Sequence, residues 1–210
     1  MRRNVHAVPL GEALSSNAMR GNSNIYDLSP GADIWKSLES CEGGGFGVKP
    51  INTMDELVTE LTTAFRFDMP LRKQTEVKRT MMRARLPSSE YTKCAFWDPV
   101  APYTRNLVAT DYENYVLLLL CWSPGKVSKV HDHPCDGCWM RVIEGDVEER
   151  LYEDQRGKMV ELSKSRYLED DVAFVDDNIG LHSIGNPFEK GAMTLHLYSP
   201  PIENCRVWPD

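Results

Sequence analysis

The sequence lacks an excess of basic residues and lacks any long apolar run. Its 210 residues include 24 Lys and Arg against 31 Asp and Glu, for a formal net charge of −7. Because phosphate contacts need clustered basic side chains, this balance argues against a nucleic-acid partner. The longest apolar stretch, residues 115–122, falls well short of the ~20 residues that span a bilayer. We therefore expect a soluble protein, not associated with a membrane, whose partner is a small molecule.

We expect no secretory signal at the N-terminus, and the cysteines show no regular framework. The N-terminus carries two early arginines but no apolar core of signal-peptide length. Six cysteines are irregularly spaced in a chain large enough to fold without disulfides; they are Cys41, Cys94, Cys121, Cys135, Cys138 and Cys205. These features predict a reducing, cytoplasmic location. No internal repeat is present, and the length suits one core. We expect a monomer.

An N-terminal extension precedes a single predicted domain. Residues 1–50 are rich in Ser, Asn, Gly and Pro and show no sustained apolar period, so we expect a poorly ordered or loop-rich segment. The remaining residues, 51–210, are expected to form one domain. Within it, helices are predicted over about 53–86 and a β-barrel over about 103–205.

Two amphipathic patterns predict the helices. Apolar residues recur at intervals of three and four from Met54 to Phe65, and Thr53 with Glu56 fits a capping box at the start of this helix. A weaker pattern predicts a second helix over 72–85, which Pro87 would end.

From about residue 103 the sequence changes to short β-branched and aromatic runs separated by Gly, Pro, Asn and Asp. Strands are predicted at 103–109, 115–122, 127–132, 138–143, 146–152, 172–175, 181–184 and 192–198. Short strands that close on one another remove exposed edges and leave an interior suited to a small ligand. We therefore predict a mostly β fold, a small β-barrel with α-helices on its N-terminal side.

Three histidines are the candidates for a metal site. A single residue separates His131 from His133, so on a strand the two imidazoles would point to the same face. Neutral imidazole binds Fe, Zn, Ni or Cu, and a third nitrogen would leave coordination positions open for other ligands. His182 is the natural third ligand, although it lies far along the chain and spacing alone does not establish the link.

Glycines and other residues at fixed intervals accompany these histidines. The first group is Gly125, His131, His133, Cys138 and Gly145, and the second is Gly180, His182 and Asn186. This pattern resembles the two motifs of the cupin superfamily, in which two histidines come from one strand and a third from a later strand of a small jelly-roll barrel. In the first motif, Cys138 stands where that superfamily usually has Glu.

Further segments narrow the resemblance. With YTRNLV at 103–108, CWS at 121–123 and LHLYSPP at 195–201, the chain resembles the cysteine dioxygenase family, over roughly residues 50–205. Members oxidise the thiol of free L-cysteine to cysteine sulfinic acid, inserting both atoms of O₂ at one Fe(II) held by three histidines. The resemblance implies an enzyme with L-cysteine and O₂ as substrates. It also implies one Fe(II) per chain, held by His131, His133 and His182.

The resemblance implies a substrate-binding pair on the first predicted strand. Arg105 would bind the cysteine carboxylate through its planar guanidinium, helped by Tyr103. Relatives that act on 3-mercaptopropionate tend to lack this arginine, so its presence favours cysteine.

A row of polar side chains is expected on the last strand. Thr194, His196 and Tyr198 alternate with apolar residues, so they share one face and could form hydrogen bonds along the row. The resemblance implies catalytic roles for Tyr198, His196 and Cys138, with Thr194 in support where the family usually has Ser. It also implies a thioether cross-link between Cys138 and Tyr198.

Several alternatives remain open from the sequence. The metal could be Zn or Ni, the substrate could be another small thiol such as 3-mercaptopropionate or cysteamine, or the protein could be a non-catalytic, metal-binding cupin. A structural zinc on His131, His133, Cys135 and Cys138 would leave His182 unexplained. A disulfide between Cys135 and Cys138 would compete with the thioether.

Overall fold

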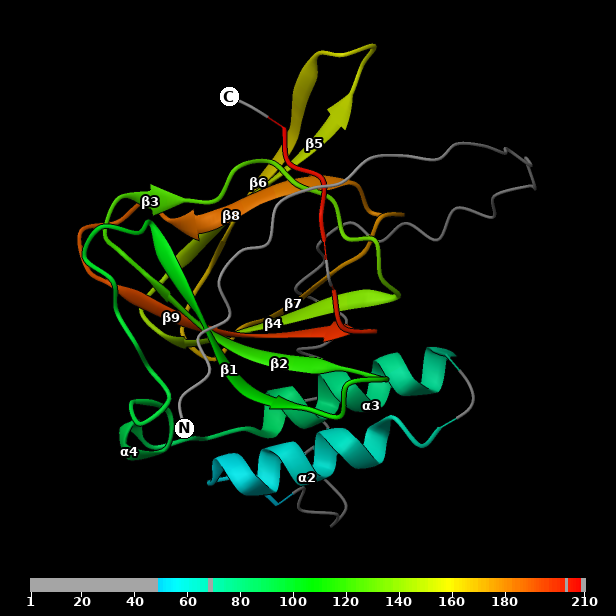
Figure 1. Cartoon of the computed structure of the whole chain (residues 1–210), viewed down its shortest axis with the longest axis vertical. Helices are drawn as coiled ribbons and strands as arrows, with labels where there is room; N and C mark the ends of the chain where they lie inside the picture. Colours follow the sequence, from blue (N-terminus) through cyan, green and yellow to red (C-terminus); the bar gives the residue numbers. More distant parts are fainter. Residues whose placement is uncertain (1–48, 68–69, 203, 209–210) are drawn as a thin grey trace, which may run out of the picture. The chain divides into compact units, whose positions relative to one another are not determined.

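The computed structural model describes residues 49–67, 70–202 and 204–208, in which three helices precede nine strands (Figure 1). The predicted extension at 1–50 lies outside this part of the chain, apart from its last two residues. Among the described residues, no helix has the length and apolar character needed to cross a membrane.

Helices α2 (Met54–Ala64) and α3 (Pro70–Arg83) form where the apolar pattern predicted them. The Thr53 hydroxyl accepts a hydrogen bond from the Glu56 backbone N–H at 3.2 Å and so caps α2. Proline suits the first turn of α3, where no N–H is needed for the helix. A short helix, α4 (Ser88–Tyr91), follows Pro87 and was not predicted.

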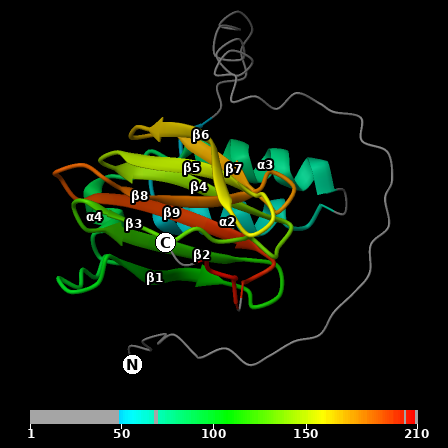
Figure 2. The ribbon, with the colours of Figure 1, turned by 90° about the horizontal axis from the view of Figure 1, so that it is seen from above.

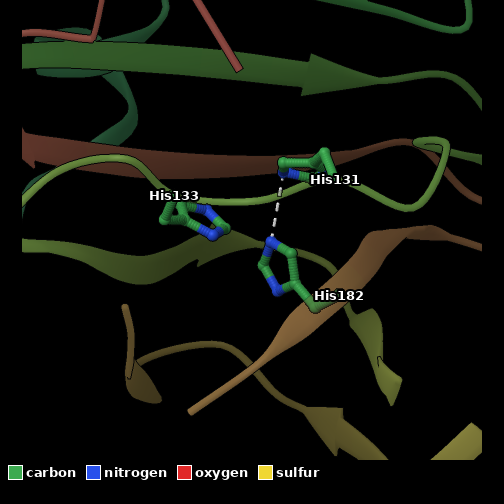
Figure 3. A group of neighbouring side chains, drawn as sticks. All are labelled: His131, His133 and His182. Carbon is green, nitrogen blue, oxygen red and sulfur yellow. Dashed lines mark hydrogen bonds between the residues drawn. The ribbon is translucent and has the colours of Figure 1, made fainter. Parts of the chain in front are cut away.

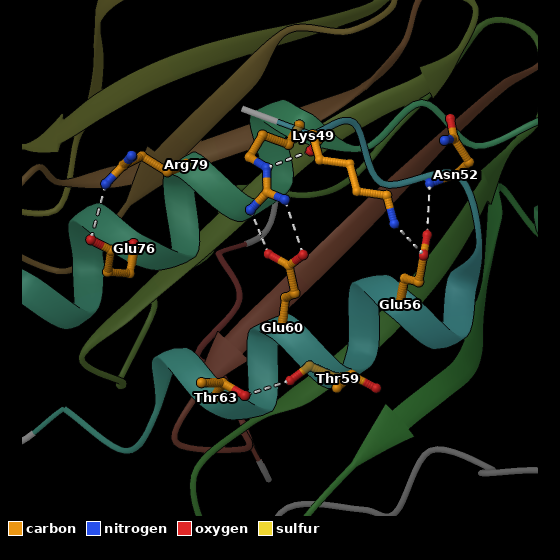
Figure 4. A network of polar contacts seen from close by, with 9 residues as sticks. Lys49, Asn52, Glu56, Thr59, Glu60, Thr63, Glu76 and Arg79 are labelled. Atoms are coloured by element: carbon orange, nitrogen blue, oxygen red, sulfur yellow. Dashed lines mark hydrogen bonds and ion pairs between the residues drawn. The ribbon is translucent and has the colours of Figure 1, made fainter. Parts of the chain in front are cut away.

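Polar contacts join the outer faces of α2 and α3 (Figure 4). The Arg83 guanidinium donates two hydrogen bonds to the Glu60 carboxylate and a third to the Lys49 carbonyl. Glu56 accepts from the Asn52 backbone N–H and from Lys49. Because ion pairs that remain accessible to solvent contribute at most about 1 kcal/mol each, these contacts add little to the stability of the helix pair.

Two antiparallel sheets make up most of the described chain. The first has the order β1-β2-β9-β4-β7, and its strands are β1 (Tyr103–Thr110), β2 (Val116–Trp122), β9 (Ala192–Ser199), β4 (Gly137–Glu144) and β7 (Val172–Val175). The second has the order β3-β8-β5-β6, and its strands are β3 (Lys126–Val127), β8 (Leu181–Asn186), β5 (Val147–Asp154) and β6 (Met159–Tyr167). Figure 2 shows β8, β5 and β6 following one another in the second sheet. The predicted fold class, mostly β with N-terminal helices, is confirmed.

One strand prediction was wrong and one strand was missed. The expected strand at 127–132 is only β3, and the chain beyond it makes isolated bridges because its backbone pairs with two separate segments, at His182 and Val207. The strand β6 was missed because most of its side chains are partly or fully exposed, so its sequence carries no apolar run.

The five-stranded sheet separates two apolar layers. Helices α2 and α3 cover one of its faces (Figure 1). There, buried apolar side chains of the helices meet those of the strands; they include Leu57, Leu61, Val77, Met81, Leu117, Leu119, Leu195 and Leu197. The other face turns toward the second sheet, with Trp122, Val142, Val147 and Ile184 among the buried residues. Strand β9 contributes to both faces, since successive strand residues alternate. Its Thr194, His196 and Tyr198 therefore face away from the helices.

Candidate metal centre

Three buried imidazoles converge between the two sheets (Figure 3). His131 and His133 lie on the segment between β3 and β4, and His182 lies on β8. One nitrogen of each ring lies within 4.8 Å of one nitrogen of each other ring. The Nε2 atoms of His131 and His182 are 3.2 Å apart. The structure therefore brings together the three histidines that the sequence singled out.

These rings fit a transition-metal ion. Two nitrogens at about 2.1 Å from one ion, with a roughly 90–109° angle between them, lie about 3.0–3.4 Å apart, which includes the spacing of His131 and His182. Burial, and then the neighbouring His182, lower the pKa of His131 to about 4 and that of His133 to about 2. Both rings are therefore neutral near pH 7. In the described part of the chain, His133 Nδ1 is buried without a hydrogen-bond partner.

Contacts with two separate partners, rather than a shared strand, place the first two histidines. The His131 N–H donates to the His182 carbonyl at 2.9 Å, and the His182 N–H donates to the His131 carbonyl at 3.1 Å. The His133 N–H donates to the Asp177 carboxylate at 2.6 Å. The segment approaches β8 closely beside Gly185, where a Cβ would lie 2.4 Å from the Val127 Cα. The expectation that His131 and His133 share a strand face is corrected, because two partners fix them instead.

A glutamate and a tyrosine that sequence reasoning missed lie behind His182. Glu149 Oε1 of β5 is 2.6 Å from His182 Nδ1, and the Tyr167 hydroxyl donates to Glu149 Oε2 at 2.9 Å. Burial, and then the Glu149 carboxylate, raise the pKa of Tyr167, so the phenol remains a donor. One signal was present in the sequence, since Glu149 lies two residues from both Val147 and Leu151 and so shares their strand face.

A cavity of about 70 Å³ opens beside the histidines. Its lining includes Arg105 from β1, His131, His133, and Tyr198 from β9. The Arg105 guanidinium lies 5.6 Å from the centre of the Tyr103 ring, with 3.5 Å between Nη2 and the Tyr103 hydroxyl oxygen. The cavity thus combines a cationic side chain, a phenol and the imidazole cluster.

The C-terminal segment borders the same cavity. Asn204 and Cys205 line it, and the following residues pair with the chain next to His131. The Asp132 carboxylate accepts hydrogen bonds from the Arg206 backbone N–H and from its Nε, both at 2.7 Å. Sequence analysis did not identify this contact, because it depends on pairing between distant segments.

The polar row on β9 forms part of a buried network. Trp122 Nε1 donates to the Thr194 hydroxyl at 2.8 Å, and His196 Nε2 lies 2.9 Å from the same oxygen. The other ring nitrogen, Nδ1, lies 3.8 Å from the Cys138 sulfur. The ring centres of His196 and Tyr198 are 6.1 Å apart. The second polar contact of His196 is therefore with Cys138, where the sequence suggested Tyr198.

A sequence model of the family described as Cysteine dioxygenase type I matches residues 48–210. The chain belongs to this family. Cysteine dioxygenase type 1 of Danio rerio is 31% identical over 166 residues, which cover 77% of this chain and 81% of the relative. That of Homo sapiens is 33% identical over 137 residues, covering 63% of this chain and 68% of the relative.

Among solved structures, a Klebsiella pneumoniae protein described as having a double-stranded beta-helix domain matches with a TM-score of 0.46 and 16% identity. The match covers 60% of this chain and 93% of that protein.

Cys138 and Tyr198 of this cysteine dioxygenase family member lie opposite each other, because β4 and β9 pair in that register. Their side chains pack in one buried cluster and are 2% and 7% exposed. Burial raises the pKa of both groups well above their usual values, so both are protonated near neutral pH.

Two alternatives from the sequence find no support in this geometry. The three-histidine cluster includes neither Cys135 nor Cys138, unlike the four-ligand zinc site. The cysteines in the described residues are free thiols, Cys135 and Cys138 among them. Burial raises the pKa of Cys135 to about 11, which leaves it a poor nucleophile for disulfide formation.

Proposed function

We propose that this chain is an Fe(II)-dependent cysteine dioxygenase that converts L-cysteine and O₂ to cysteine sulfinic acid. The observation that carries the proposal is the convergence of three buried imidazoles beside a cavity that also contains Arg105 and Tyr198. When bound, Fe(II) would supply the redox chemistry and would favour the substrate thiolate over the thiol. Membership of the cysteine dioxygenase type I family supports the same reaction.

Incubation of the iron-loaded chain with L-cysteine tests this proposal. We expect O₂ uptake together with cysteine sulfinic acid, and a higher kcat/KM for L-cysteine than for 3-mercaptopropionate or cysteamine. Binding of iron and cysteine without turnover would instead indicate a non-catalytic, metal-binding protein. Faster turnover of 3-mercaptopropionate would keep the enzyme class but change the substrate.

Binding and orientation of the substrate are assigned to the β1 side of the cavity. We propose that Arg105 pairs with the cysteine carboxylate, since a guanidinium offers two parallel N–H groups that match the two oxygens. The phenol of Tyr103 packs against Trp122 with the two rings tilted and 4.5 Å between ring centres, and so limits the positions open to Arg105. Val116 and Leu118 line the same cavity and offer an apolar wall.

The Arg105→Gln variant is expected to raise KM for cysteine between about 10-fold and 100-fold, because a hydrogen bond to a charged group contributes about 1.5–3 kcal/mol. Steady-state O₂ uptake measures the change. Cysteamine lacks the carboxylate, so its KM should change little in the same variant. Arg79→Gln, on the exposed face of α3, serves as the matched control. An unchanged KM for cysteine would remove Arg105 from the substrate site.

Proton handling is assigned to the β9 row and Cys138. We propose that the Tyr198 hydroxyl lies beside the bound substrate and donates a hydrogen bond during the reaction. His196 would orient the Thr194 hydroxyl through the hydrogen bond between them. Burial lowers the pKa of His196 to about 3, so its ring is a neutral hydrogen-bonding group. We further propose that Cys138 and Tyr198 become joined by a thioether, which would fix the phenol in place. Formation of this bond releases two protons and two electrons, and O₂ is the oxidant.

A gel of reduced, denatured protein tests the thioether. After incubation with Fe(II), cysteine and O₂, wild-type protein is expected to run as two bands, because the cross-linked chain is more compact when denatured. The Cys138→Ala variant should give one band. Cys135→Ala, which removes the neighbouring thiol, should still give two. A single wild-type band with an intact mass that retains both hydrogens would contradict the cross-link.

The cellular location and the oligomeric state of the chain are also proposed. We propose a cytoplasmic monomer. The free thiols in the described residues are compatible with a reducing compartment, and a single chain supplies every residue assigned to the site.

A further inference from the structure

Glu149 is a buried carboxylate with an unusual environment. Its side chain is 9% exposed, and it accepts from Tyr167 while lying 2.6 Å from His182 Nδ1. In the described part of the chain, His182 is its one ion-pair partner. The adjacent Glu148, on the opposite face of β5, instead pairs with Arg150 and Lys164. The two glutamates therefore differ in whether a basic side chain neutralises them.

A buried carboxylate without a basic partner is costly, because removal of a charge from water must be offset by an opposite charge or by hydrogen bonds. The tyrosine hydroxyl supplies one hydrogen bond to Glu149 and the imidazole supplies the other. A metal cation on the far side of the His182 ring would provide the missing positive charge. The Glu149 carboxylate and the position for the ion thus lie on opposite sides of the His182 ring.

The contact also fixes which nitrogen of His182 faces the site. When Nδ1 carries the proton and donates it to Glu149, the lone pair is on Nε2. Nε2 is the atom that lies 3.2 Å from His131 Nε2. Rotation of the ring away from this orientation would break the contact with Glu149, so the carboxylate favours the arrangement that a metal ion needs.

We propose that Glu149 and Tyr167 are positioning residues for the metal: Glu149 holds the tautomer and orientation of His182 and places a negative charge one imidazole from the ion, and Tyr167 holds Glu149. This inference rests on the proposed iron site. The charge raises the affinity for iron and stabilises Fe(III) more than Fe(II), since the more highly charged ion gains more from a nearby anion.

Two variants and two matched controls test the assignment. Glu149→Gln keeps the shape of the side chain but removes its charge, and it should raise the Fe(II) dissociation constant about 10-fold to 100-fold. Its Fe(III)/Fe(II) midpoint potential should shift to a more positive value. Tyr167→Phe should shift both quantities in the same direction by a smaller factor. Glu148→Gln, on the other face of β5, and Tyr152→Phe, on the same strand, should change neither quantity.

The dissociation constant is measured by anaerobic competition with a chromophoric chelator, and the potential by redox titration of the bound iron. A dissociation constant and potential in Glu149→Gln equal to those of Glu148→Gln would overturn the proposal and leave Glu149 a purely structural residue. Tyr167→Phe provides a second test if Glu149→Gln fails to fold. Neither readout depends on cysteine turnover, so iron binding without sulfinate would contradict the proposed function alone. Wild-type protein that binds no iron would overturn both.

Discussion

The His182→Ala variant is expected to lose stoichiometric iron binding and to lower kcat/KM for cysteine by more than about 100-fold. Removal of a group that merely supports a ligand costs about 10-fold to 100-fold in metal affinity, and removal of a ligand itself should cost more. His182 is 3% exposed, and its Nε2 lies 3.2 Å from His131 Nε2. The variant therefore removes one of the three nitrogens that would bind the ion. Metal analysis after desalting and O₂ uptake with cysteine measure the two effects.

Ser183→Ala is the matched control for this variant, because Ser183 is the next residue of β8 and is also buried. Its iron content and activity should stay close to the wild-type values. Iron bound at one equivalent in His182→Ala, with wild-type affinity, would show that the convergence of the three rings does not create the metal site.

The Arg141→Met variant is expected to lower the free energy of unfolding by about 3–5 kcal/mol, because it leaves buried carbonyl oxygens without donors. Arg141 of β4 is 1% exposed and lies on the helix side of the sheet. It donates to the carbonyls of Met81 and Ala84 at the end of α3 and pairs with Asp170. One side chain thus links α3 to the sheet and satisfies carbonyls at the helix end.

Urea unfolding of the metal-free protein measures this effect, with the slope of the transition as a check that the unfolding mechanism is unchanged. Arg79→Met is the control, since Arg79 is an exposed arginine of α3 that pairs with Glu76. It should change the free energy by less than about 0.5 kcal/mol. Because Arg141 faces away from the histidines, folded Arg141→Met protein should keep its KM for cysteine. A loss of stability equal to that of Arg79→Met would contradict the role given to Arg141.

The pair of histidines at 131 and 133 and most strands were predictable because their signals are local. His131 and His133 are separated by one residue, and the glycines around them mark turns. Strands β2 and β9 carry strong apolar patterns, since both of their faces are largely buried. Spacing could not link His182 to the pair. That link came from the resemblance to a family, and the structure supplied the contact.

The residues that support the cluster could not be found with the same reasoning. Alternation along β5 places Glu149 on the face of Val147 and Leu151, but only the pairing of β5 with β8 brings that face to His182. The contact between Asp132 and Arg206 likewise joins segments far apart in the sequence. The strand β6, which carries Tyr167, lacks an apolar run because it lies at the edge of its sheet with exposed side chains. Register between distant strands, rather than composition, determines these contacts.

The most direct measurement is the oxygen-isotope content of the product formed by iron-loaded protein from L-cysteine under ¹⁸O₂. If the three imidazoles hold an iron that serves a dioxygenase reaction, cysteine sulfinic acid should carry ¹⁸O in both sulfinate positions, in an amount equal to the O₂ consumed. Sulfinate that carries ¹⁸O in one position or none, or cysteine that stays unchanged while iron is bound, would contradict the account.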